Sequence, residues 1–243
     1  LPLPAVDAPE QVIAPNQYTY YRREQLAGLV RAQALVIGPG GQIYLLDSAG
    51  KRIYILDQTG AVLTHLEQAA LPFQELSDLD VDSQGNLYVL DAQQSVISVF
   101  DAAGNFRHLL AQAQGKLGVA RGLTVAADGS IWVAATSLGQ LLQLNADGAE
   151  QRAIPIGKDG SGQPVDVIVT SAGDLLVTEG TLGEILRFSA TGELLARQRI
   201  APFNTAEGAH FAADPAGKLY VTNPESGALV HITEQGAIQQ QWR

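Results

Sequence analysis

The chain has 243 residues, of which 46% are hydrophobic and 16% charged, so its composition is that of a globular protein and excludes a disordered or collagen-like chain. Its 25 acidic and 15 basic residues give a formal net charge of −10, which disfavours binding to nucleic acid. The sequence contains no cysteine, which excludes disulfides, thiolate metal sites and thiol nucleophiles. No apolar run approaches the roughly eighteen residues of a membrane helix, so we expect no membrane span in this chain.

Glycine recurs at intervals of 44 residues through most of the chain. The first glycine column comprises Gly41, Gly85, Gly129, Gly173 and Gly217. The second comprises Gly60, Gly104, Gly148, Gly192 and Gly236. An apolar column with the same period lies between them and comprises Tyr44, Tyr88, Trp132, Leu176 and Tyr220. This periodicity predicts five structural units over residues 34–243, which begin near residues 34, 78, 122, 166 and 210.

Residues 1–33 precede the first complete unit and are predicted to form a partial blade or a hairpin at the seam of the fold. Segments 11–14 and 17–23 fit the third and fourth strands of a preceding repeat. Either five blades close with this hairpin packed at the seam, or a six-bladed ring lacks one or two strands. We favour the six-bladed type. In both cases an unclosed ring would leave strand edges available for pairing with another chain.

Each complete unit is expected to contain four short strands joined by tight turns. In the third unit, these are residues 123–126, 130–134, 141–144 and 150–154. The turns are rich in Asp, Asn, Ser and Thr, and their glycines supply the positive φ that hairpin turns require. Four-stranded units of roughly 40–50 residues are typical of a β-propeller, so we predict an all-β propeller.

Three of the units resemble NHL-type repeats. The resemblance lies in residues 79–91 (LDVDSQGNLYVLD), 123–134 (LTVAADGSIWVA) and 211–223 (FAADPAGKLYVTN), and extends over about residues 34–243. It implies a propeller, usually six-bladed, of the broad class that also holds the gluconolactonase-like and streptogramin-lyase-like enzymes. Propellers with such repeats serve as scaffolds, ligand binders and, less often, enzymes, so the resemblance implies a fold more than an activity.

The residue at the start of each unit's first strand departs from the repeat. This column reads Ala34, Asp78, Gly122, Asp166 and His210. Because the first strand of a blade lines the central channel, we expect Asp78, Asp166 and His210 to converge at its mouth. Together with the nearby Arg121 and Glu207, they form our candidate ligand site. The two carboxylates and the imidazole could ligate a divalent cation or perform acid–base chemistry, or they could simply bond loop amides around the channel.

The residues that the enzyme-like relatives use are incomplete in this chain. Gluconolactonase-like propellers bind calcium through Glu, Asn and Asp at the axis, but the channel column has no Asn. Of the four histidines, only His210 falls on that column. A second polar column, at the end of each second strand, is interpreted as structural because an Asp there turns the chain into the next strand. It comprises Asp47, Asp91, Ala135, Glu179 and Asn223.

These patterns favour a non-enzymatic binding or interaction module that presents its loop-bearing face to a protein, a glycan or a small ligand. The alternative is a metal-dependent hydrolase or lyase that uses Asp78, Asp166 and His210. No cofactor is expected under the first hypothesis, and calcium or another divalent cation under the second. The missing initiator Met and the absence of Cys favour a processed, extracytoplasmic bacterial protein that is periplasmic, secreted or on the cell surface.

Overall fold

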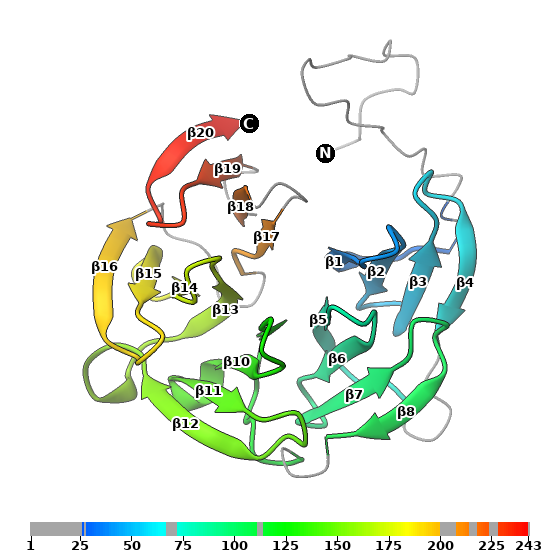
Figure 1. The fold of residues 1–243 in the computed structure, drawn as a ribbon, viewed down its shortest axis with the longest axis horizontal. Helices are drawn as coiled ribbons and strands as arrows, with labels where there is room; N and C mark the ends of the chain where they lie inside the picture. The colour runs from blue at the N-terminus through cyan, green and yellow to red at the C-terminus, as the bar shows by residue number, and fades with distance from the viewer. Residues whose placement is uncertain are drawn as a thin grey trace.

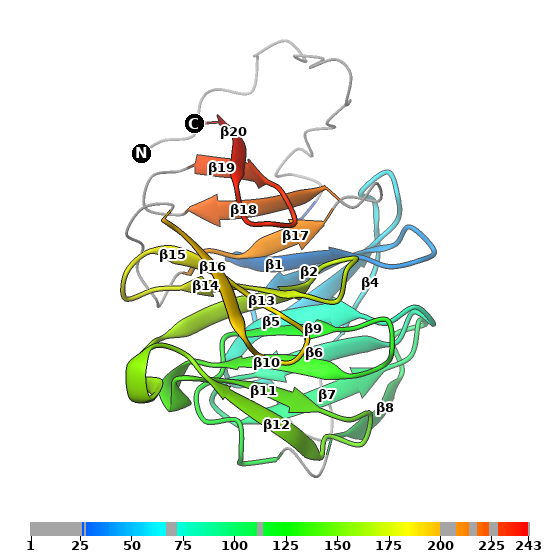
Figure 2. The same cartoon turned by 60° about the vertical axis from the view of Figure 1, so that its left-hand side comes forward.

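A computed structural model describes residues 26, 28–66, 72–110, 114–199, 208–213, 218–223 and 228–242. Five four-stranded antiparallel sheets surround a common axis, and each sheet is one blade of a β-propeller (Figure 1). The prediction of an all-β propeller with four strands in each repeat is confirmed. The first strands of successive blades contact one another near the axis (Figures 1 and 2). In the described part of the chain, no helix is long and apolar enough to cross a membrane.

The strands of each blade follow one another in chain order, with the first strand innermost. Blade 1 comprises β1 (Ala32–Ile37), β2 (Ile43–Asp47), β3 (Arg52–Leu56) and β4 (Val62–Leu66). Blade 2 comprises β5 (Leu76–Val81), β6 (Leu87–Asp91), β7 (Val96–Phe100) and β8 (Phe106–Leu109). Blade 3 comprises β9 (Gly122–Val125), β10 (Ile131–Ala135), β11 (Gln140–Leu144) and β12 (Glu150–Pro155). Blade 4 comprises β13 (Pro164–Val169), β14 (Leu175–Glu179), β15 (Glu184–Phe188) and β16 (Leu194–Arg199). Blade 5 comprises β17 (Phe211–Ala213), β18 (Leu219–Asn223), β19 (Ala228–Ile232) and β20 (Ile238–Trp242).

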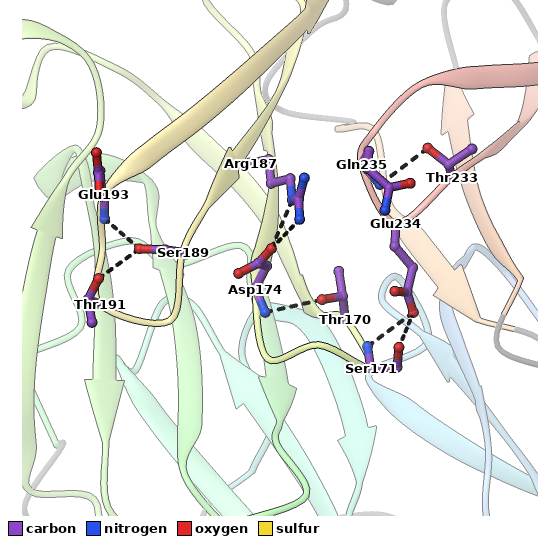
Figure 3. A network of polar contacts seen from close by, with 10 residues as sticks. All are labelled: Thr170, Ser171, Asp174, Arg187, Ser189, Thr191, Glu193, Thr233, Glu234 and Gln235. Atoms are coloured by element: carbon purple, nitrogen blue, oxygen red, sulfur yellow. Dashed lines mark hydrogen bonds and ion pairs between the residues drawn. The ribbon is translucent and has the colours of Figure 1, made fainter.

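The turn between the third and fourth strands is closed in the same way in every blade. An oxygen on the side chain of its first residue accepts hydrogen bonds from backbone N–H groups further along the turn; these residues are Asp57, Asp101, Asn145, Ser189 and Thr233. Figure 3 shows this arrangement at Ser189 and Thr233. The glycine at the end of each turn has a positive φ, for example +81° at Gly60. The predicted role of both glycine columns is confirmed for their described members, and Gly217 lies outside the described residues.

The carboxylates at the ends of the second strands hold the loops beside them. Asp91 accepts hydrogen bonds from the backbone N–H groups of Gln74 (2.7 Å), Gln94 (3.0 Å) and Glu75 (3.2 Å). Asp47 and Glu179 bind loop amides in the same manner. Blade 3 has Ala135 at this position, and there the Ser137 hydroxyl accepts from Val119 N instead (2.8 Å). The structural interpretation of this column therefore agrees with the contacts of its described carboxylates.

Hydrophobic clusters join neighbouring blades. Tyr44 and Leu46 of blade 1 belong to one buried cluster with Leu87 of blade 2. Trp132 of blade 3 shares a cluster with Leu175 of blade 4. Similar clusters join blade 2 to blade 3 and blade 4 to blade 5. A second strand with a neighbouring blade on each side buries both of its faces, which explains why the sequence of β10 is apolar throughout.

The described residues form five blades, so our preference for a six-bladed type is wrong and the five-bladed alternative agrees with the structure. The reason is that each complete 44-residue unit supplies all four strands of one blade. The partial blade predicted for residues 11–23 lies outside the described residues. Figure 1 shows blade 5 and blade 1 at the two ends of an arc, and we call the boundary between them the seam.

Candidate ligand site at the propeller axis

A cavity of about 1080 Å³ lies at the axis and extends toward the seam. Inner-strand residues of all five blades line it. Its apolar walls include Leu35, Val36 and Phe211. Its polar lining includes Asp78, Asp80, Thr124, Asp166 and His210. Three of the five residues predicted for the ligand site therefore lie at one cavity.

Two of these aspartates connect successive blades. Asp78 Oδ2 accepts a 2.8 Å hydrogen bond from the backbone N–H of Leu123, and Asp166 Oδ2 accepts one of 2.7 Å from Phe211. In both pairs the donor lies 45 residues further along the chain, on the inner strand of the next blade. We call these contacts interblade clasps. Both carboxylates are buried, so each clasp satisfies an inner-strand amide away from solvent.

Asp80 makes a further clasp between blades 2 and 3. Its Oδ2 accepts hydrogen bonds from Val125 N (2.8 Å) and from the Thr124 hydroxyl (3.0 Å). Sequence reasoning missed this residue. The signal was available, because the corresponding positions hold Val36, Thr124, Ile168 and Ala212, so that Asp80 is the single charged residue in its column.

Gly122 takes the place of a clasp residue between blades 3 and 4. A Cβ atom at this glycine would lie 2.5 Å from Asp166 Oδ1 and 2.7 Å from the carbonyl oxygen of Val165. A side chain at residue 122 would clash at these distances. The close approach of β9 and β13 therefore requires glycine at this position.

His210 occupies the clasp position of blade 5, and its imidazole faces back toward blade 4. Its backbone N–H donates to the hydroxyl of Thr222 (3.1 Å). Its Nδ1 atom lies 3.6 Å from Asp166 Oδ2, which is too long for a hydrogen bond. This Nδ1 atom is buried and makes no hydrogen bond within the described part of the chain. At the wall of the cavity, His210 therefore has a ring nitrogen within ion-pair distance of Asp166 but without a hydrogen bond to a described residue.

Burial and mutual repulsion shift the proton affinities of the axial groups. Burial raises the pKa of Asp78 well above its ordinary value, and the neighbouring Asp166 carboxylate raises it further. Burial also raises the pKa of Asp80 to about 6, against the hydrogen bonds from Val125 and Val81 that favour its ionised form. Burial lowers the pKa of His210, but the Asp166 and Asp78 carboxylates outweigh burial, and the net pKa shift is upward.

The other predicted site residues are placed differently. Arg121 is not among the residues that line the cavity, although its positive charge acts to lower the pKa of His210. Glu207 lies outside the described residues. Within the described ranges, no three His, Asp or Glu side chains are grouped so that they could hold a metal ion.

No protein-family model matches the chain, and no curated protein matches it. Among solved structures, a streptogramin B lyase is similar with a TM-score of 0.67 and 22% identity, over 87% of this chain and 68% of that chain. A virginiamycin B lyase from Staphylococcus aureus gives a TM-score of 0.66 and 17% identity, over 87% and 69%. A structure of the nidogen/laminin complex gives 0.73 and 13%, over 87% and 80%. Identities this low establish the fold alone, so these comparisons show that the chain is a β-propeller like the proteins it resembles.

Proposed function

We propose that this propeller is a non-enzymatic binding module that takes its ligand into the axial cavity. The observation that carries the proposal is the buried Nδ1 of His210, which makes no hydrogen bond to a described residue, in a cavity of about 1080 Å³ with largely apolar inner-strand walls. Such a cavity is large enough for a small molecule or for part of a glycan or peptide. The ligand in this proposal has an apolar body and an oxygen atom that accepts a hydrogen bond from His210.

The contacts of the carboxylates favour binding over acid–base catalysis. A general acid or base needs a position from which it can exchange a proton with a substrate. Asp78 and Asp166 instead accept hydrogen bonds from backbone amides of the next blade. Removing either group would leave an inner-strand amide of the next blade without its acceptor, so a structural role accounts for both carboxylates.

Thermal-shift titration tests this proposal with medium-chain carboxylates, alkyl glycosides and apolar tripeptides as probes. A ligand at a hundredfold excess over its Kd stabilises the folded state by about 2.7 kcal/mol. We expect at least one probe class to raise the melting temperature of the wild type but not of His210→Asn. His108→Asn is the control, because the His108 side chain is exposed on β8, and its melting temperature should rise as in the wild type. Stabilisation that is equal in both variants would place the ligand elsewhere and contradict the proposal.

A lyase or hydrolase is the second candidate, and the geometry of His210 and Asp166 favours it. A carboxylate 3.6 Å from an imidazole nitrogen could orient a histidine base after a small adjustment. One structurally similar protein is a catalytically inactive H270A virginiamycin B lyase with quinupristin. Quinupristin is therefore the substrate to try with this chain, and its consumption can be followed by chromatography. Turnover that His210→Asn abolishes would establish the enzyme and reject the binding module.

The binding proposal requires no metal cofactor. We expect calcium, zinc and manganese to leave the melting temperature of the wild type unchanged. A rise in melting temperature that disappears in Asp78→Asn and Asp166→Asn would instead support the metal-dependent alternative.

A further inference from the structure

Acidic groups outnumber basic ones in the lining of the axial cavity. Among the described residues, the lining includes Asp78, Asp80, Asp166 and the imidazole of His210, but no lysine or arginine. Arg121 also acts on the charge of His210 but does not belong to the lining. Because a poorly solvated wall screens charge weakly, the cavity favours a cationic group on its ligand over an anionic one.

Asp166 and His210 place a hydrogen-bond acceptor beside a possible donor at the axial end of the cavity. The two oxygens of Asp166 accept hydrogen bonds of 2.7 Å each from the backbone N–H groups of Val167 and Phe211. An ionised carboxylate has about four acceptor positions, so Asp166 can accept a further hydrogen bond without releasing its clasp. His210 Nδ1 lies 3.6 Å from Asp166 Oδ2, and a protonated Nδ1 can donate to a ligand.

The free amino terminus of a peptide carries the complementary pair of groups. Its ammonium group donates hydrogen bonds, and the carbonyl oxygen of the same residue, about 3 Å away in an extended chain, accepts them. This separation is close to the 3.6 Å between Asp166 Oδ2 and His210 Nδ1. A ligand carboxylate or sugar hydroxyl could also accept from His210, but neither would bring a positive charge to the acidic lining.

The rest of the cavity suits apolar side chains. From the axis it continues between blades 1 and 5, where its lining includes Leu35, Leu45, Phe211 and Tyr220. Leu35 is 53% exposed, so a ligand that covers it removes apolar surface from water. A volume of about 1080 Å³ is sufficient for a short peptide.

We propose that the ligand of the axial cavity is a peptide with a free amino terminus and apolar first residues, whose ammonium group binds Asp166 and whose first carbonyl oxygen accepts a hydrogen bond from His210. The apolar side chains of the peptide lie along the walls formed by β1 and β17. Asp78 and Asp80 favour the ammonium group through their charge. This inference rests on the proposed binding function and adds to it the chemical class of the ligand.

Isothermal titration calorimetry of the wild type at about pH 6.5 tests the proposal with the amide of the peptide Leu-Ala-Leu and with its N-acetyl and N-succinyl derivatives. These probes end in a positive, a neutral and a negative group. We expect affinity to fall in that order, by about tenfold at the first step. The amide of N-acetyl-Leu-Ala-Lys carries its positive charge elsewhere and should bind no better than the N-acetyl derivative. This last probe separates recognition of the amino terminus from the general attraction of a cation to a chain with a net charge of −10.

The outcomes distinguish this inference from the proposed function. Equal affinities of the free and the N-acetyl peptide would overturn the inference, while binding itself would still support the binding module. Stabilisation by an alkyl glycoside without binding of any peptide would have the same meaning. Failure of every probe would reject both.

Asp166→Asn tests the contact with the ammonium group. Asparagine keeps an oxygen that can accept the clasp from Phe211 but removes the negative charge. We expect this variant to lose most of the preference for the free over the N-acetyl peptide, whereas Asp147→Asn, at an exposed turn position, should keep it. If Asp166→Asn does not fold, Asp80→Asn takes its place and should weaken the preference to a smaller extent. An unchanged preference in the variant that is measured would overturn the proposal.

Discussion

At the axis, single side chains accept hydrogen bonds from backbone N–H groups, as carbonyl groups of a paired strand do within a blade. The inner strands of neighbouring blades lie side by side without a shared ladder of hydrogen bonds, so their axial N–H groups need other acceptors. Asp78, Asp80 and Asp166 supply them. The cost is that three carboxylates lie close together in a poorly solvated place, which raises the pKa of Asp78 and of Asp80.

This cluster predicts how stability depends on pH. The pKa of Asp80 is about 6 in the folded protein and about 3.9 in an unfolded chain, so the folded state binds this proton more tightly. Its contribution to stability is fully present below about pH 4 and is lost as the pH rises through 6. The raised pKa of His210 also makes the folded state less stable as the pH rises, at higher pH than Asp80 does. Turn carboxylates whose pKa is lowered, such as Asp128, titrate below this range.

We therefore expect the free energy of unfolding to fall between pH 4.5 and pH 7, and Asp80→Asn to reduce that fall. Urea denaturation at a series of pH values measures both quantities. Asp147→Asn, at an exposed turn position, is the control and should keep the wild-type profile. A profile for Asp80→Asn that runs parallel to the wild type would show that this carboxyl does not titrate as proposed.

At the scale of single elements, the turns set the strand boundaries. A polar first residue and a glycine with positive φ close each turn between a third and a fourth strand, and the two strands lie directly on either side of the turn. Gly129, between β9 and β10, isolates the backbone contribution because its φ is +82° and a Cβ atom there would meet nothing within 4 Å. Any cost of a substitution at Gly129 must therefore come from the conformation and not from a clash.

Gly129→Ala should lower the free energy of unfolding by about 1 kcal/mol, since alanine at positive φ is strained. Gly40→Ala is the control, because Gly40 has no positive φ and its new Cβ would meet only the flexible end of Gln42. Denaturant unfolding of both variants gives the comparison. A Gly129→Ala variant as stable as the wild type would mean that the glycine column has another cause.

The strands could be predicted from sequence because they depend on local chemistry. In the third unit, the predicted segments 123–126 and 150–154 differ by one residue from β9 and β12, since the turns that bound them are visible in the sequence. The convergence of Asp78, Asp166 and His210 followed from the repeat alone. The clasps could not be predicted from the repeat, because they depend on the distance between adjacent blades. The five complete units were also visible in the sequence, but the choice between five and six blades was wrong, because the number of blades around the axis depends on packing between blades and not on the residues of any one unit.

At the scale of the whole molecule, each blade depends mainly on its two neighbours, as in other repeat proteins. Blade 3 shares one cluster with blade 2 and another with blade 4. Blade 5 shares a cluster only with blade 4 among the described residues. Blade 5 lacks, among the described residues, the packing that a following blade would supply, so stability should decrease from the middle of the arc toward blade 5.

Amide hydrogen exchange measures this gradient, because exchange from the native state reports the free energy of local opening. We expect the amides of β18 (Leu219–Asn223) to exchange faster than those of β10 (Ile131–Ala135), although both are second strands with a partner on each side in their own sheet. The difference follows from packing: both faces of β10 are covered by neighbouring blades, whereas one face of β18 looks into the seam. Equal protection of the two strands would show that the arc unfolds as one cooperative unit in which the seam carries no energetic weakness.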